Sequence, residues 1–227
     1  MSLLVCFLTG RSDRANTALS PAQAGFLDAL PIGVGERLDV NFPYAPAGGP
    51  WRATPLALAS VRNTRDYLAS RRAGFPRAHA AAVREVFTRA DRTLVLAGSC
   101  GLELLANLRL DAPALARLHV VAYGPVARSR PRVSLETVTG AGDALARWST
   151  ARWPASGRAA AESPAGASDH LIDAHHLDYL ASPALHAIVV RAIERLRSAD
   201  AAPITGEGAH GGARDGAHAG ARDGGGT

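Results

Sequence analysis

The sequence predicts an α/β protein built on an open, mostly parallel sheet of about six strands with helices on both faces. Two observations indicate this fold class. Short apolar runs bounded by Gly, Pro or polar residues recur along the chain, as is typical of strands buried on both faces of a parallel sheet. Segments with apolar residues at helical spacing separate these runs, so strands and helices alternate through residue 200.

Six segments have the character of strands. The first, 2–8, is a continuous apolar run ended by Thr9 and Gly10, which predicts a central strand. The second, 36–44, instead alternates apolar and polar residues, as a half-buried strand does. In order along the chain, the predicted strands are 2–8, 36–44, 93–98, 118–124, 132–140 and 170–174.

Helices are predicted from apolar spacing together with capping signals. Ser20 and Ser182 are candidate N-caps, and each precedes a proline at the first helical position, where the missing N–H of proline leaves no bond unmade. Residues 73–76 interrupt the longest helical stretch. The predicted helices are 20–30, 54–72, 77–90, 101–110, 143–153 and 182–199.

The composition divides the chain into one domain and a tail. Residues 1–200 are long enough for one apolar core, with 154–168 expected to be a loop. Residues 201–227 are rich in Gly, Ala, His and Arg and have no apolar period. We expect this tail to be disordered, because it cannot bury enough apolar surface to offset the entropy of ordering.

Charge and cysteine content exclude several classes of protein. The 25 basic residues, all arginine, exceed the 20 acidic ones, but they are scattered and aromatic residues make up only 5%, which argues against nucleic-acid binding. Cys6 and Cys100 are the only cysteines and predict buried free thiols, with no disulfide framework, no metal and no cofactor. No stretch reaches the ~20 apolar residues of a membrane span, and no signal peptide is evident, so we expect a cytoplasmic protein.

A candidate nucleophile lies in "RTLVLAGSCGLELLANL", where a predicted strand joins a predicted helix. A nucleophile on such a tight turn needs small residues two positions before and two after it. Around Ser99 these are Ala97 and Gly101, whereas Leu102 would crowd the turn if Cys100 were the nucleophile. The pattern favours Ser99. A small-residue turn without chemistry is the alternative.

A serine nucleophile needs a base and a carboxylate that orients the base. Asp143 follows the predicted strand 132–140, and His175 and His176 follow the strand 170–174. Ligand sites of open α/β sheets lie at these carboxyl ends. Taken alone, Asp143 is better explained as the N-cap of the next helix, but the order Ser, Asp, His after three separate strands favours a catalytic set.

These motifs resemble those of the α/β-hydrolase superfamily over about residues 1–200. "LVLAGSCG" is similar to the family's strand, nucleophile elbow and helix, "TGAGD" resembles its acid turn, and "HHLDYL" its histidine turn "GHxDYL". The resemblance implies that Ser99, Asp143 and His176 form the catalytic triad, with His175 standing where the family often has Gly. The rival carboxylates Asp173 and Asp178 fit the pattern less well.

The resemblance also implies an oxyanion hole and a site without a lid. The family commonly has His-Gly after the strand that leads into its oxyanion loop, whereas this chain has Thr9-Gly10 after the corresponding strand 2–8. By position, the backbone N–H groups of Arg11 and Cys100 are expected to bind the oxyanion together. The connection between the predicted strands 118–124 and 132–140 is too short for a lid domain.

The implied function is hydrolysis of an ester or thioester through a Ser99 acyl-enzyme. An open site suits an acyl group tethered to a carrier protein. Arginines in 61–72 and 126–132 could meet such a partner, although a solvated face is the favoured explanation for them. Two alternatives stay open: acyl transfer by the same triad, and an inactive hydrolase fold kept for binding. The sequence does not indicate an oligomeric state.

Overall fold

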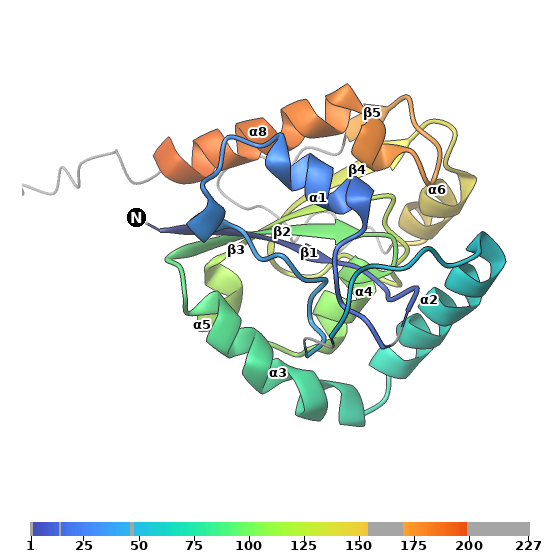
Figure 1. Ribbon diagram of the computed structural model, residues 1–227, viewed down its shortest axis with the longest axis horizontal. Coiled ribbons are helices and arrows are strands. Elements are labelled where there is room, and N and C mark those ends of the chain that lie inside the picture. Colours follow the sequence, from blue (N-terminus) through green and yellow to red (C-terminus); the bar gives the residue numbers. More distant parts are fainter. Residues whose placement is uncertain (1, 14, 46–47, 154–169, 199–227) are drawn as a thin grey trace, which may run out of the picture.

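The computed structural model describes residues 2–13, 15–45, 48–153 and 170–198. At its centre is an open sheet of five strands in the order β1-β2-β3-β4-β5, all parallel (Figure 1). The strands are β1 (Leu3–Leu8), β2 (Arg92–Gly98), β3 (Leu118–Tyr123), β4 (Ser134–Gly140) and β5 (His170–Ile172). Because all five run in the same direction, their carboxyl ends lie along one edge of the sheet.

The expectation of about six strands is corrected to five in the described residues. The predicted strand 36–44 does lie beside β1, but it meets β1 only through two isolated parallel bridges, at Arg37 and Phe42. Between them, Val40 pairs with Ala18 in the antiparallel sense. The ends of the predicted strand differ as well, since Glu36 belongs to a 3₁₀ helix and Pro43 lies in a turn. The alternating pattern carries no information on whether the pairing with β1 is continuous.

Each predicted helical segment contains a helix, and the structure adds a short one. The added helix is α5, which follows the predicted end of 101–110 because Asp111 caps it by accepting a hydrogen bond from the Ala114 N–H at 3.0 Å. The α-helices of the described residues are α1 (Pro21–Asp28), α2 (Leu56–Ser70), α3 (Gly74–Phe87), α4 (Gly101–Asn107), α5 (Ala112–Ala116), α6 (Ala144–Ala151) and α8 (Pro183–Ser198). Two single-turn 3₁₀ helices are η1 (Val34–Glu36) and η2 (Tyr179–Ala181).

The start of α1 shows how local sequence sets an element. The Ser20 hydroxyl accepts the Gln23 N–H at 3.2 Å, and the Gln23 side chain accepts the Ser20 N–H at 2.9 Å. This reciprocal capping box satisfies two backbone donors that the helix itself leaves unpaired. The predicted N-cap at Ser20 is therefore confirmed.

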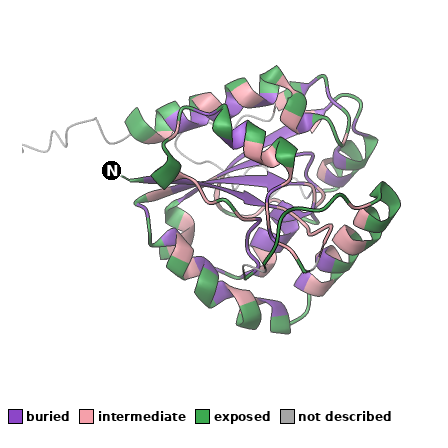
Figure 2. Cartoon of the chain, viewed as in Figure 1, coloured by how far each residue is buried: buried purple, intermediate pink, exposed green. Residues whose placement is uncertain are grey.

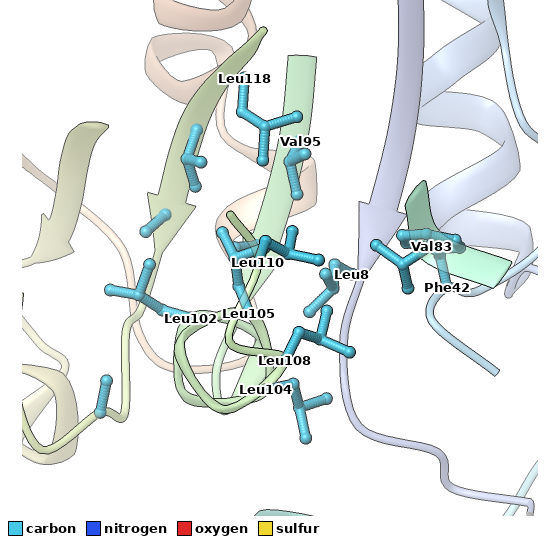
Figure 3. Close-up of a cluster of buried hydrophobic side chains, with 14 of the residues drawn as sticks. Leu8, Phe42, Val83, Val95, Leu102, Leu104, Leu105, Leu108, Leu110 and Leu118 are labelled. Carbon is cyan, nitrogen blue, oxygen red and sulfur yellow. The ribbon is translucent and has the colours of Figure 1, made fainter. Parts of the chain in front are cut away.

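The sheet is buried on both faces, as its apolar strands predict (Figure 2). On one face β1, β2 and β3 pack against α3 and α4 through side chains such as Leu8, Val83 and Leu104 (Figure 3). On the other face they pack against α1 and α8 through Phe26 and Ile188, among others. Helices thus cover both faces of the sheet.

The connection between β3 and β4, where the sequence predicts no lid domain, is short. Residues 124–133 link β3 to β4 and contain no helix. The predicted loop 154–168 and the tail 201–227 lie outside the described residues. Among the helices that are described, none has both the length and the apolar character needed to span a bilayer.

Candidate active site

Ser99 occupies a strained turn directly after β2. Its φ angle is 51°, a left-handed backbone conformation that costs a non-glycine residue about 1–3 kcal/mol. The turn is fixed on both sides, since the Ser99 N–H donates to the Tyr123 carbonyl at 3.1 Å and the Val126 N–H donates to the Ser99 carbonyl at 2.9 Å. A Cβ at Gly101 would lie 1.8 Å from the Leu8 carbonyl oxygen, so the small residue predicted there has a direct steric cause.

The structure brings the three predicted side chains into one hydrogen-bonded chain. The Ser99 Oγ lies 3.2 Å from His176 Nε2, and His176 Nδ1 lies 2.8 Å from Asp143 Oδ2. His176 is partly exposed, with 29% of its side chain accessible, whereas the Asp143 side chain is 1% exposed. The imidazole therefore links an accessible hydroxyl to a buried carboxylate.

Asp143 has two roles, one for each carboxylate oxygen. Its Oδ1 accepts the Ala146 N–H at 3.0 Å and caps α6, and its Oδ2 accepts hydrogen bonds from His176 and, at 2.9 Å, from the Tyr179 hydroxyl. Burial would raise the pKa of this carboxyl, but these three hydrogen bonds outweigh burial and hold the pKa below its usual value. Asp143 thus caps α6 and is hydrogen-bonded to His176 at the same time.

Tyr179, which sequence reasoning did not assign a role, fixes the Asp143 carboxylate. The residue is 2% exposed, and its hydroxyl accepts the Gly140 N–H at 2.6 Å while donating to Asp143. A Cβ at Gly124, which has a φ of 53°, would come within 2.7 Å of the Tyr179 ring. The signal was present in the motif "HHLDYL", where Tyr179 follows His176 by three positions.

The rival residues lie elsewhere. His175 is exposed, and its Nδ1 lies 3.2 Å from the Gly142 carbonyl oxygen, to which it can donate. Asp173 and Asp178 are exposed. Within the described residues, the one carboxylate hydrogen-bonded to His176 is Asp143.

The loop after β1 turns its backbone donors toward the protein. The Thr9 N–H donates to Asn41 Oδ1 at 3.1 Å, and the Arg11 N–H donates to Asp66 Oδ2 at 3.0 Å. The guanidinium of Arg11 also pairs with Asp66 and lies over the Tyr44 ring, 3.6 Å from its centroid. The N–H expected to be the second oxyanion donor therefore already has a partner. No sequence motif indicates Asn41 or Asp66 as anchors of this loop.

Cys100 and Cys6 are free and buried, as expected. Burial raises the pKa of each thiol to about 12, so both are protonated near neutral pH, and a protonated thiol is a weak nucleophile. Cys100 stands directly before α4, where helix N-terminal N–H groups lack intrahelical partners.

A pocket of about 290 Å³ lies beside Ser99 and His176. Its walls come from the loop after β1, the start of α1, residues 51–52 and the segment around η2. Most of the lining residues are polar, but the lining surface itself is more apolar than polar, and the apolar residues among them include Ala18, Trp51, Leu177 and Leu180. In the described residues, no three His, Cys, Asp or Glu side chains are placed to hold a metal ion.

Another buried carboxylate is that of Glu136, the third residue of β4. His119 Nε2 lies 2.7 Å from its Oε1 and His170 Nε2 lies 3.0 Å from its Oε2, while Arg195 also pairs with it. Burial would raise the pKa of Glu136, but its histidine hydrogen bonds and the charge of Arg195 outweigh burial and lower the pKa to about 2. This cluster joins β3, β4, β5 and α8, and we interpret it as structural.

The sequence matches no protein-family model and no curated protein.

Proposed function

We propose that the protein is a serine hydrolase of the α/β-hydrolase type, which cleaves an ester or thioester through an acyl-enzyme on Ser99. The observation that carries the proposal is the continuous hydrogen-bonded chain from Ser99 Oγ through both ring nitrogens of His176 to Asp143 Oδ2, with distances of 3.2 and 2.8 Å. The strained turn at Ser99 supports it, since strained backbone concentrates at functional sites.

The reaction follows from the roles of these groups. His176 Nε2 accepts the hydroxyl proton as Ser99 Oγ attacks the acyl carbon, and Asp143 stabilises the imidazolium that forms. The imidazolium then gives this proton to the departing alcohol or thiol. Water, activated by the same imidazole, attacks the acyl-enzyme, and the proton returns to Ser99 as the carboxylic acid leaves.

The developing oxyanion needs donors next to Ser99. The backbone N–H of Cys100 supplies the first of them. The N–H of Arg11 supplies the second only if it leaves Asp66, because the two groups are hydrogen-bonded at 3.0 Å. Substrate binding therefore includes a small movement of the loop after β1. A carrier-tethered acyl group remains one candidate substrate.

The test is turnover of short-chain p-nitrophenyl esters and acyl thioesters by the wild type, Ser99→Ala and the control Ser198→Ala. Ser198 is exposed at the end of α8, where its hydroxyl bonds the Glu194 carbonyl. We expect Ser99→Ala to lower kcat by several powers of ten and Ser198→Ala to match the wild type. A folded wild type without turnover, or equal rates for all three proteins, would contradict the proposal.

A further inference from the structure

Tyr123, the last residue of β3, lines the pocket beside Ser99. Its side chain lies over Gly98, the residue before the nucleophile, because a Cβ at Gly98 would come within 2.4 Å of the Tyr123 hydroxyl oxygen. Neighbouring Cα atoms are about 3.8 Å apart, so the hydroxyl lies within about two residue lengths of the Ser99 Cα. Any side chain at position 98 would displace it.

The Tyr123 ring is fixed, but its hydroxyl has no hydrogen bond within the described residues. The ring packs edge-on against Phe7, with centroids 6.4 Å apart, and tilted against Tyr179, with centroids 5.8 Å apart. The residue is 8% exposed, and burial raises the pKa of the phenol. The pocket thus contains a rigid, protonated donor whose hydrogen bond is unmade.

Several neighbouring polar groups of the pocket are already used by the fold, and Asn63 Oδ1, which is buried there without a hydrogen-bond partner, can only accept. Asn41 holds the loop after β1 through Thr9. Ser20 and Gln23 form the capping box of α1, and Asn16 Oδ1 accepts the Ala18 N–H at 2.7 Å. The Tyr123 hydroxyl is in contrast available to a ligand. Because this donor lines the pocket and makes no hydrogen bond to the described residues, a ligand oxygen can accept from it without breaking a hydrogen bond of the fold.

The acyl part of the substrate is the group that this donor faces. The acyl group stays on Ser99 through both half-reactions, whereas the leaving group must depart toward solvent, and Tyr123 is buried. A volume of about 290 Å³ lies at the small end of ligand pockets. Both features indicate a short acyl chain with its substituent close to the carbonyl carbon.

We propose that the Tyr123 hydroxyl recognises an oxygen substituent on the acyl chain, so that the substrates are esters or thioesters of short hydroxy, alkoxy or keto acids. This inference rests on the proposed function of Ser99. It assigns Tyr123 as a specificity-determining residue, which contacts the substrate but takes no part in proton transfer.

The test compares p-nitrophenyl butyrate with p-nitrophenyl methoxyacetate and p-nitrophenyl 3-hydroxybutyrate. Methoxyacetate has the chain length of butyrate with an ether oxygen in place of one CH₂. Intrinsic reactivity differs between these esters but cancels when the ratio of kcat/KM values in the wild type is divided by the ratio in Tyr123→Phe. We expect at least one oxygen-bearing ester to lose about tenfold in this double ratio.

Tyr67→Phe is the matched control, since Tyr67 lies on α2 under the Arg71 guanidinium, 4.2 Å from its ring centroid, and does not line the pocket. Its ratios should equal those of the wild type. Unchanged ratios in Tyr123→Phe for both oxygen-bearing esters would overturn the inference and leave the serine hydrolase proposal intact. A folded wild type that hydrolyses none of the three esters would overturn both.

A second measurement uses the wild type alone, in case Tyr123→Phe does not fold. Methoxyacetate and butyrate are allowed to compete with a serine-directed fluorophosphonate probe for Ser99, and their inhibition constants are compared. We expect methoxyacetate to bind about five- to tenfold more tightly, because its ether oxygen accepts the Tyr123 hydrogen bond. Equal or weaker binding than butyrate would overturn the inference.

Discussion

Tyr179→Phe removes one oxygen atom from beneath the candidate triad and keeps the ring. In the wild type this oxygen accepts the Gly140 N–H at 2.6 Å and donates to Asp143 Oδ2 at 2.9 Å. The variant therefore loses a hydrogen bond to a charged group, which is typically worth about 1.5–3 kcal/mol, and leaves a buried backbone N–H unpaired, which costs about 1–3 kcal/mol. The two effects overlap, so we expect the free energy of unfolding to fall by about 2–4 kcal/mol.

The same substitution should also change the kinetics, in a way that a loss of stability alone would not. With one donor fewer, the Asp143 carboxylate interacts more strongly with the cationic form of His176, to which it is hydrogen-bonded. The acidic limb of the kcat/KM profile should then move to higher pH, and kcat should fall by about tenfold through looser orientation of the imidazole.

Urea unfolding gives the stability change, and kcat/KM for an aryl ester between pH 5 and 9 gives the profile. Tyr67→Phe is again the control, with both quantities expected to match the wild type. If Tyr179→Phe loses stability but keeps the wild-type profile and kcat, Tyr179 supports only the fold, and the role argued for it in holding Asp143 is refuted.

The remaining predictions concern the base, the loop after β1 and the second carboxylate. His176→Ala should lower kcat by several powers of ten. His175→Ala should lower kcat far less, because the His175 ring is hydrogen-bonded only to the Gly142 carbonyl among the described residues. Steady-state kinetics would decide, and a more severe loss in His175→Ala would make His175 the base in place of His176. Asp66→Asn keeps the shape of the side chain but weakens the hydrogen bond that it accepts from the Arg11 N–H. KM or kcat should therefore change for a substrate whose oxyanion uses that N–H. Unchanged kinetics would show that the Arg11 N–H is not an oxyanion donor. The pKa of Glu136 is lowered from 4.5 to about 2 in the folded protein, so its ionised carboxylate stabilises the fold by about 3 kcal/mol above pH 4.5, and this stabilisation is lost as the pH falls toward 2. The free energies of unfolding of the wild type and Glu136→Gln should therefore converge between pH 4.5 and 2. A difference that stays constant over this range would contradict the prediction.

Much of the fold could be predicted because burial and local sterics determine it. Continuous apolar runs exist where a strand is covered on both faces, and the runs at 93–98 and 118–124 correspond to β2 and β3. The extra helix α5 and the broken pairing of 36–44 were not predictable in the same way. They depend on one cap at Asp111 and on the tertiary neighbour Ala18.

In the candidate site, too, some residues could be predicted from the sequence and others could not. Ser99, Asp143 and His176 could be found because each follows a strand, and parallel strands bring their carboxyl ends to one edge of the sheet. The groups that hold them could not be found by such an argument. Asp66 reaches the loop after β1 from the middle of α2, and Tyr123 reaches the pocket only because Gly98 leaves room for its ring.

The central claim is that Ser99 is an activated nucleophile, and covalent labelling tests it most directly. The full chain is treated with a fluorophosphonate probe, digested, and the modified residue is located by mass spectrometry. The account predicts one adduct, on Ser99, which disappears in Ser99→Ala, slows by orders of magnitude in His176→Ala and persists in Ser198→Ala. An adduct on Cys100, or no adduct on a folded wild-type protein, would contradict it.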